Sequence, residues 1–372
     1  MRRYVLSLLF IVPCVWETAV AGVETPCDPS VCSLRDNCFC LGTRPPANLS
    51  ASSMPQFVML TFDDAVNEQN MDFYRQLLGP GRRRNRANGC NLAATFFVSA
   101  GYTDYSLVHE LHSVGSEIAI HSITYMNKTD KLPFFPYTLD YGLAMPCTVP
   151  SCPSGSHPGL WLVPLNSFYR TILHGDRWRS FGSSCAMPDT CTPQPTTEDD
   201  TLDFLRSNFE RYYHTNRTPF PVFIHETWLW NPGRRRGYLS FVDWLLTMDD
   251  VFVVTVAEVV RFMRHPKPLG EYAQAGCSRA SEFRRCPRVH SCSFPDAPIP
   301  ETRQLVGCKP CPESYPWLRD VVRRKAEDDD DQRVVRKQQY FGSGCVLVFC
   351  SALVVCLYVA ARRFGRRKTH CF

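Results

Sequence analysis

Five short apolar runs in the middle of the chain constrain its fold more than any other feature. Each run is nearly continuous and rich in β-branched or aromatic residues, as in strands buried on both faces of a parallel sheet. Segments with helical periodicity lie between them, and Thr197 with Asp200 predicts a capping box before the third of these. Repeated strand–helix units predict an α/β fold, either a barrel or an open sheet. The runs are Phe57–Phe62, Ala93–Val98, Glu117–Ile120, Phe220–Ile224 and Val251–Val256, and the helical faces carry Met71, Tyr74, Leu77 and Leu78, then Val108, Leu111 and Val114, then Leu202, Leu205, Phe209 and Tyr212.

Polar side chains stand where these runs end. Asp63 and Asp64 close the first run, His121 closes the third and His225 closes the fourth. The carboxyl ends of parallel strands meet on one face, so these four side chains are expected to converge there as a site. Taken singly, each has a simpler explanation, because an Asp after a strand is often a helix cap and a lone His is often a core residue.

The two ends of the chain predict an export signal and a membrane anchor. Residues 1–21 combine a basic start, an apolar stretch and an Ala-Val-Ala ending, which is typical of a secretory signal peptide. Residues 341–361 carry no charge and are long enough to cross a bilayer core of about 30 Å. The basic segment 362–368 follows and marks the cytoplasmic side. We therefore expect a single-pass protein of the cell membrane with its N-terminal part outside; a buried soluble helix is the alternative.

The cysteines agree with an extracellular location. Fourteen of the 19 cysteines fall between the signal peptide and the span, and an even number in an oxidising compartment predicts disulfide bonds. Cys308 and Cys311 have the spacing of half a zinc ribbon, but a disulfide is the expected use. The basic residues of the two ends supply more positive charge than the whole net charge of +5, so nothing in the outer part indicates nucleic-acid binding. Glycosylation sequons begin at Asn48, Asn127 and Asn216.

Composition divides the chain into seven parts. A globular domain at 56–266 lies between a cysteine-rich segment at 22–55 and a Pro- and Cys-rich extension at 267–320. The signal peptide at 1–21 precedes them. A charged stalk at 321–340, the span at 341–361 and a basic tail at 362–372 follow.

Four motifs and the cysteine frame resemble the polysaccharide deacetylase family, with its NodB-homology barrel, and in particular the animal chitin deacetylases. The motifs are "TFDDA", "ATFFVSAGYT", "GSEIAIHSIT" and "FIHETWL", and the resemblance runs from Cys27 to about Asp320. It implies a distorted (β/α) barrel between small disulfide-rich segments. It also implies metal-dependent hydrolysis of N-acetyl groups on chitin or another N-acetylglucosamine polymer.

The resemblance assigns a role to each candidate residue. Asp63 would be the general base that takes a proton from the attacking water, and His225 the general acid that protonates the leaving amine. Asp64 and His121 would bind a divalent metal, in the first place zinc. Such an ion lowers the pKa of water from 15.7 to about 7 and polarises the acetamide carbonyl.

One metal ligand of the family pattern is replaced. The family places a second histidine four residues after the first, and this chain has Tyr125 there. A phenol has a pKa of about 10, so holding it as an anion at pH 7 costs about 4 kcal/mol. We therefore expect weak metal binding, with Tyr125 or a water molecule completing the site.

The domain is also shorter than a closed barrel. Five strand runs occupy 56–266, whereas a closed barrel takes about 250 residues at about 30 per βα unit. No strand–helix unit is evident between Ile123 and Thr197, and the family's Arg-x-Pro-Tyr motif is missing. We expect at least two units to be absent between about Asn127 and Pro133, which leaves an incomplete barrel.

Three hypotheses for function follow. The first is a membrane-anchored chitin or polysaccharide deacetylase, favoured by the four retained site residues. The second is a catalytically impaired relative that binds or organises extracellular polysaccharide, favoured by Tyr125 and the missing motif. The third is a structural cell-surface module whose cysteine-rich ends make protein contacts.

Overall fold

The computed structural model describes residues 26–318, apart from residue 80 and the segments 122–131, 146–151, 175–176, 181–183, 278–281 and 296–301. The predicted signal peptide, stalk, span and basic tail therefore lie outside the described residues, as do Tyr125 and Asn127. Among the helices of the described part, none has the length and apolar character to span a membrane. The chain divides into two compact units, Met1–Pro287 and Arg288–Phe372.

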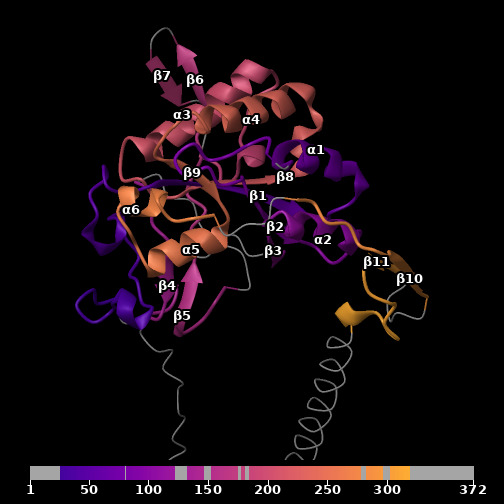
Figure 1. The fold of residues 1–372 in the computed structure, drawn as a ribbon. Helices are drawn as coiled ribbons and strands as arrows, with labels where there is room; N and C mark the ends of the chain where they lie inside the picture. The colour runs from indigo at the N-terminus through magenta and orange to yellow at the C-terminus, as the bar shows by residue number, and fades with distance from the viewer. Residues whose placement is uncertain are drawn as a thin grey trace, which may run out of the picture. The chain divides into compact units, whose positions relative to one another are not determined.

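The first unit is built on a parallel sheet of five strands (Figure 1). The strands are β1 (Gln56–Asp64), β2 (Thr95–Val98), β3 (Glu117–Ile120), β8 (Phe220–His225) and β9 (Val251–Val254). They run in the order β3-β2-β1-β8, and β9 pairs with the first half of β1. All five apolar runs of the sequence are strands, so the prediction of an α/β fold with a parallel sheet is confirmed.

Helices bury both faces of this sheet. Side chains of β1 alternate, so that Val58, Leu60 and Phe62 face one cluster while Phe57 and Met59 face another. The first cluster packs against α1 (Glu68–Leu78), α2 (Tyr105–Ser113), α3 (Glu198–Tyr213) and α4 (Pro232–Leu245). The second packs against α5 (Val256–Arg264) and α6 (Leu269–Ala273). In Figure 1, α3 and α4 lie side by side and α5 lies across the sheet from them.

Each of the first five helices is preceded by a polar capping residue. Its side chain accepts a hydrogen bond from a backbone N–H of the first turn, and that N–H has no partner within the helix. Of the capping box predicted for Thr197 and Asp200, the structure shows one of the two hydrogen bonds, in which the Thr197 side chain accepts from the N–H of Asp200. These caps fix where each helix leaves its loop. The five capping residues are Asn67, Asp104, Thr197, Asn231 and Thr255.

The described residues between β3 and α3 form two antiparallel hairpins and no strand–helix unit. β4 (Tyr137–Leu139) pairs with β5 (His157–Leu162), and β6 (Thr171–His174) pairs with β7 (Arg177–Ser180). Within the described residues β3 pairs only with β2, and Ile120 at its end is 87% exposed. The described strands thus form an open sheet, and the finer description as an incomplete barrel stays a prediction. The short 3-10 helices are η1 (Leu34–Asp36), η2 (Pro46–Asn48), η3 (Pro188–Thr190), η4 (Glu226–Trp230) and η5 (Pro316–Leu318).

Disulfide bonds hold the irregular segments, as predicted. All thirteen described cysteines between the predicted signal peptide and the predicted span are disulfide-bonded. The Arg288–Phe372 unit contains the hairpin of β10 (His290–Phe294) with β11 (Arg303–Gly307), and Cys292–Cys311 lies beside buried Phe294 and Tyr315. Cys308 is also disulfide-bonded, which removes the zinc-ribbon alternative. In the first unit the bonds include Cys27–Cys40, Cys32–Cys38, Cys90–Cys277 and Cys185–Cys191.

Candidate functional site

Four predicted site residues come together at the carboxyl edge of the sheet. Asp63 lies opposite His225 in the pairing of β1 with β8. The Nε2 atom of His121 is 3.9 Å from Asp63 Oδ2 and 3.9 Å from Asp64 Oδ1. The Nε2 atom of His225 is 3.9 Å from Asp64 Oδ2. Three strands that are far apart in sequence thus supply one compact group of two carboxylates and two imidazoles.

The two carboxylates differ in their surroundings although they are adjacent in sequence. The side chain of Asp63 is 10% exposed, whereas that of Asp64 is 58% exposed. Asp64 has φ of +78°, a left-handed conformation that Asp tolerates better than most residues. Asp64 is the last residue of β1, so this backbone conformation stands at the point where the strand ends. The pair is therefore one buried acid and one accessible acid.

Burial changes the acidity of Asp63. Loss of solvent raises the pKa of this carboxyl from 3.8 to about 6, against the opposing attraction of His225 and His121. Its Oδ1 atom is buried and has no hydrogen-bond partner among the described residues. A buried carboxyl with a pKa near neutrality and an uncommitted oxygen has the properties of a general base.

Asp189 is a site residue that the sequence did not reveal. Its Oδ2 atom accepts a hydrogen bond from Nδ1 of His225 at 2.7 Å and another from the backbone N–H of His225 at 2.8 Å. The hydrogen bond to Asp189 is the main cause that raises the pKa of His225, and burial of the ring opposes it. Because the carboxylate only accepts, it holds the proton on Nδ1 and leaves Nε2 directed toward Asp64.

A disulfide positions this acid. Asp189 lies in η3, and the Cys185–Cys191 bond closes the loop that contains it. Cys185 also pairs through its backbone with Phe168, which is buried in the main core. The only sequence signal was this pair of cysteines around a Pro-Asp-Thr turn, since the loop has no periodicity that would place it beside β8.

The geometry of His121 and Asp64 fits a shared divalent cation. Zinc binds imidazole nitrogen and carboxylate oxygen at about 2.0–2.2 Å, so two ligand atoms of one ion can be up to about 4.2 Å apart. The 3.9 Å between His121 Nε2 and Asp64 Oδ1 is within this limit. His121 and Asp64 are thus two candidate ligands among the described residues; Tyr125, at the sequence position of a third, lies outside them.

An apolar wall adjoins the buried acid. The rings of Phe97 and Phe223 stack with their centroids 5.8 Å apart. Phe97 pairs in register with Asp63, and Phe223 pairs with buried Thr61. Residues in register share a face of the sheet, so both half-buried rings lie on the face that carries Asp63. They supply an apolar surface beside the buried carboxyl group.

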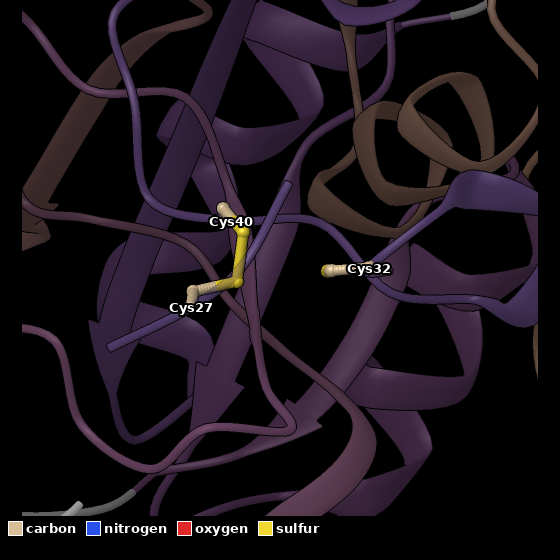
Figure 2. Close-up of side chains that lie close together, drawn as sticks. All are labelled: Cys27, Cys32 and Cys40. Atoms are coloured by element: carbon tan, nitrogen blue, oxygen red, sulfur yellow. A yellow bond between two sulfur atoms is a disulfide. The ribbon is translucent and has the colours of Figure 1, made fainter. Parts of the chain in front are cut away.

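The amino-terminal cysteines form a second cluster with ligand-like spacing. The sulfur atoms of Cys27, Cys32 and Cys40 lie within 4.8 Å of one another. Figure 2 shows the bond between Cys27 and Cys40, and Cys32 is bonded to Cys38. Metals bind thiolates, and all three of these sulfurs are already in disulfide bonds. The cluster is therefore a disulfide staple.

The predicted glycosylation sites differ in accessibility. Asn48 is exposed. Asn216 is half-buried, and its Nδ2 donates hydrogen bonds to the carbonyl oxygens of Thr43 and Pro133. A glycan on Asn216 would have to displace these bonds. Both sites stay predictions.

Two curated proteins of the silkworm Bombyx mori are similar to this chain over most of its length. The protein named chitin deacetylase 8 is 32% identical over a 394-residue alignment that covers 85% of this chain and 98% of the relative. Chitin deacetylase 1 is 31% identical over 374 residues, with 79% of this chain and 68% of the relative covered. No family model matches the chain. Both alignments are longer than the 372-residue chain itself, so each relative has residues without a counterpart here.

Proposed function

The chain belongs to the polysaccharide deacetylase family as a relative of the chitin deacetylases, and we propose that it removes acetyl groups from an N-acetylglucosamine polymer such as chitin. The observation that carries the proposal is the site itself. A buried acid, an accessible acid and two imidazoles meet beside an apolar wall, and one imidazole is held by a further carboxylate. These groups include two candidate metal ligands, a candidate general base and a candidate general acid for metal-assisted amide hydrolysis.

In the proposed reaction Asp64 and His121 hold a divalent cation, for which zinc is the first choice. When bound, the ion polarises the acetamide carbonyl and lowers the pKa of water. Asp64 suits this part because its carboxylate is accessible and 3.9 Å from Nε2 of His121. The donor set of carboxylate oxygen and imidazole nitrogen is one that zinc accepts.

Asp63 takes the proton of the attacking water. Its pKa of about 6 leaves it ionised at neutral pH and still basic enough to accept a proton. His225 gives a proton to the leaving amine from Nε2. Asp189 prepares this step by fixing the ring through Nδ1 and by favouring the protonated imidazole. The two proton transfers are thus assigned to side chains on β1 and β8.

A specific observation favours a second candidate function. The alignments to the relatives are longer than this chain, and a tyrosine replaces the third predicted metal ligand. A relative that binds extracellular polysaccharide with little or no turnover would have these properties. In that case the aromatic and polar edge of the sheet is a binding surface.

The test is acetate release from chitin oligomers by the purified protein with zinc supplied. The proposal expects release that falls to background in Asp63→Asn and is unchanged in Asp249→Asn, an exposed aspartate of the same unit. No release above the Asp63→Asn level, together with retained oligomer binding, would instead establish the binding function.

We also propose that the protein is anchored in the cell membrane by residues 341–361 with residues 22–340 outside. The disulfide-bonded cysteines support export to an oxidising compartment. Protease treatment of intact cells tests it, because the outer part should be digested and the basic tail protected.

A further inference from the structure

Two large aromatic side chains are exposed on loops that leave the carboxyl edge of the sheet. Tyr102 follows β2 and is 85% exposed, and Trp230 ends η4 after β8 and is 62% exposed. β2 and β8 pair with opposite edges of β1, which carries Asp63 and Asp64. The two aromatics therefore leave the sheet on either side of the candidate site.

The loop that carries Tyr102 is fixed to the site. Ser99 N–H donates to Asp64 O, and Asp104 N–H donates to Val66 O. The hydroxyl of Thr103 accepts from Val66 N–H and donates to Ser99 O. The segment 99–104 is thus bonded to the segment 64–66 along its length, so the position of Tyr102 is set by the same turn that sets Asp64.

The backbone of Tyr102 is also unusual. Its φ is +62°, in the left-handed region that bulky side chains rarely adopt. Glycine or asparagine would satisfy this conformation at less cost. A ring that is costly to hold there and that is almost fully exposed contributes little to the stability of the free protein. Such an outlier beside a site motivates a functional explanation.

Trp230 is held in a comparable way on the other side. Its Nε1 donates a hydrogen bond to Oε2 of Glu226, a residue that is itself buried. This bond restrains the indole while most of the ring remains in solvent. A restrained, exposed aromatic has a flat apolar face and loses little entropy on binding.

We propose that Tyr102 and Trp230 are the two stacking residues of an extended polysaccharide groove that crosses the site, each in contact with a sugar ring some residues away from the acetamide that reacts. The inference rests on the proposed function, because the polymer class comes from there. Pyranose rings present an apolar C–H face, and a polymer that passes over Asp63 has further rings on both sides. The two aromatics thus select for chain length and do not touch the reacting group.

The experiment measures binding without turnover. The full chain is treated with a chelator and titrated with the hexamer and the monomer of N-acetylglucosamine. Tyr102→Asn removes the ring and keeps a residue that tolerates the backbone, so its thermal stability should equal or exceed that of the parent. Affinity for the hexamer should fall about tenfold, the size of loss expected when an aromatic residue is removed from a binding interface. Affinity for the monomer should be unchanged.

Two further variants complete the design. Tyr102→Phe keeps the ring and should bind the hexamer within about twofold of the parent. Trp230→Phe retains an apolar ring but loses the bond to Glu226, and Trp230→Ala removes the ring, so the loss of affinity should grow in that order. Trp317→Ala, at an exposed aromatic in the Arg288–Phe372 unit, is the matched control and should have no effect.

Unchanged hexamer affinity in Tyr102→Asn or in Trp230→Ala would overturn the two-sided groove. An equal loss for monomer and hexamer would also overturn it, because the rings would then act at the reacting sugar. Failure of the proposed function is a separate result, in which neither the parent nor the aromatic variants release acetate. Length-dependent binding without acetate release would uphold the groove and refute the enzyme.

Discussion

Asp189 accepts two hydrogen bonds from His225, one from the ring Nδ1 at 2.7 Å and one from the backbone N–H at 2.8 Å. The carboxylate therefore fixes the strand end and the ring together. Asp189→Asn should lower kcat for deacetylation by about 100-fold or more, because a mispositioned general acid loses most of its contribution. Asp249→Asn is the matched control, and equal kcat in both variants would contradict the role.

The same contact predicts a change in the pH profile. Asp189 raises the pKa of His225, so His225 keeps its proton to higher pH than a free imidazole. If protonated His225 is the acid, activity is lost as pH rises through this pKa. Asp189→Asn should move that alkaline limb to lower pH, which a pH series of kcat measures. A limb that does not move would show that another group limits activity there.

The buried Asp63 carboxyl should destabilise the metal-free protein at neutral pH. Its folded pKa of about 6 exceeds the ordinary 3.8, so folding favours the protonated form. The stability that the protonated Asp63 provides is fully present below about pH 4 and is lost as the pH rises through the folded pKa of about 6. At pH 7 the ionised carboxyl therefore lowers the free energy of unfolding by up to about 3 kcal/mol. Asp63→Asn should raise the free energy of unfolding at pH 7 in chelator by up to this amount.

Denaturant titrations at pH 4 and pH 7 check this expectation. The gain in the free energy of unfolding of Asp63→Asn should largely disappear at pH 4, where Asp63 of the parent protein is already protonated. Asp64→Asn is the control, because that carboxylate is 58% exposed and should change stability little. A gain of equal size at both pH values would point to packing and not to charge.

Restoring the family ligand should strengthen metal binding. Tyr125→His places a neutral imidazole where the chain has a phenol that must lose its proton to bind. Groups that only hydrogen-bond to a metal ligand are already worth about 10- to 100-fold in affinity, so gaining a direct ligand should lower the dissociation constant for zinc by more than about 100-fold. Calorimetric titration measures it, with Tyr141→His as control. Equal zinc affinity in the parent and in Tyr125→His would mean that position 125 does not bind the ion.

Close packing of α3 against α4 should depend on one glycine. A Cβ at Gly237 would lie 2.5 Å from Glu198 O and 2.5 Å from Thr201 Cβ, atoms that belong to α3. Gly237→Ala should therefore destabilise by about 1–3 kcal/mol despite the better helix propensity of alanine. Gly270→Ala in α6 meets nothing within 4 Å and should be neutral or stabilising. Thermal unfolding of both variants compares them, and equal Tm shifts would contradict the packing argument.

The amino-acid sequence by itself determined the strands of the sheet and the residues at their ends. β3 was predicted at Glu117–Ile120 and is observed there, because an apolar run bounded by polar residues has few other uses. Asp63, His121 and His225 were predicted to converge, since parallel strands align their carboxyl ends. The cysteines predicted disulfide bonds. These are local patterns or simple consequences of topology.

Only the tertiary structure determined which neighbouring groups hydrogen-bond to these residues and bury them. Asp189 reaches His225 from a loop closed by a disulfide, a contact that no periodicity encodes. The pKa of Asp63 depends on burial by neighbours remote in sequence, and Tyr102 is notable through a backbone angle and its exposure. Acidity, orientation and exposure arise from the sum of many long-range contacts. The sequence therefore identified the family and the positions of the candidate site, and the packing around them determined the acidity and orientation of its side chains.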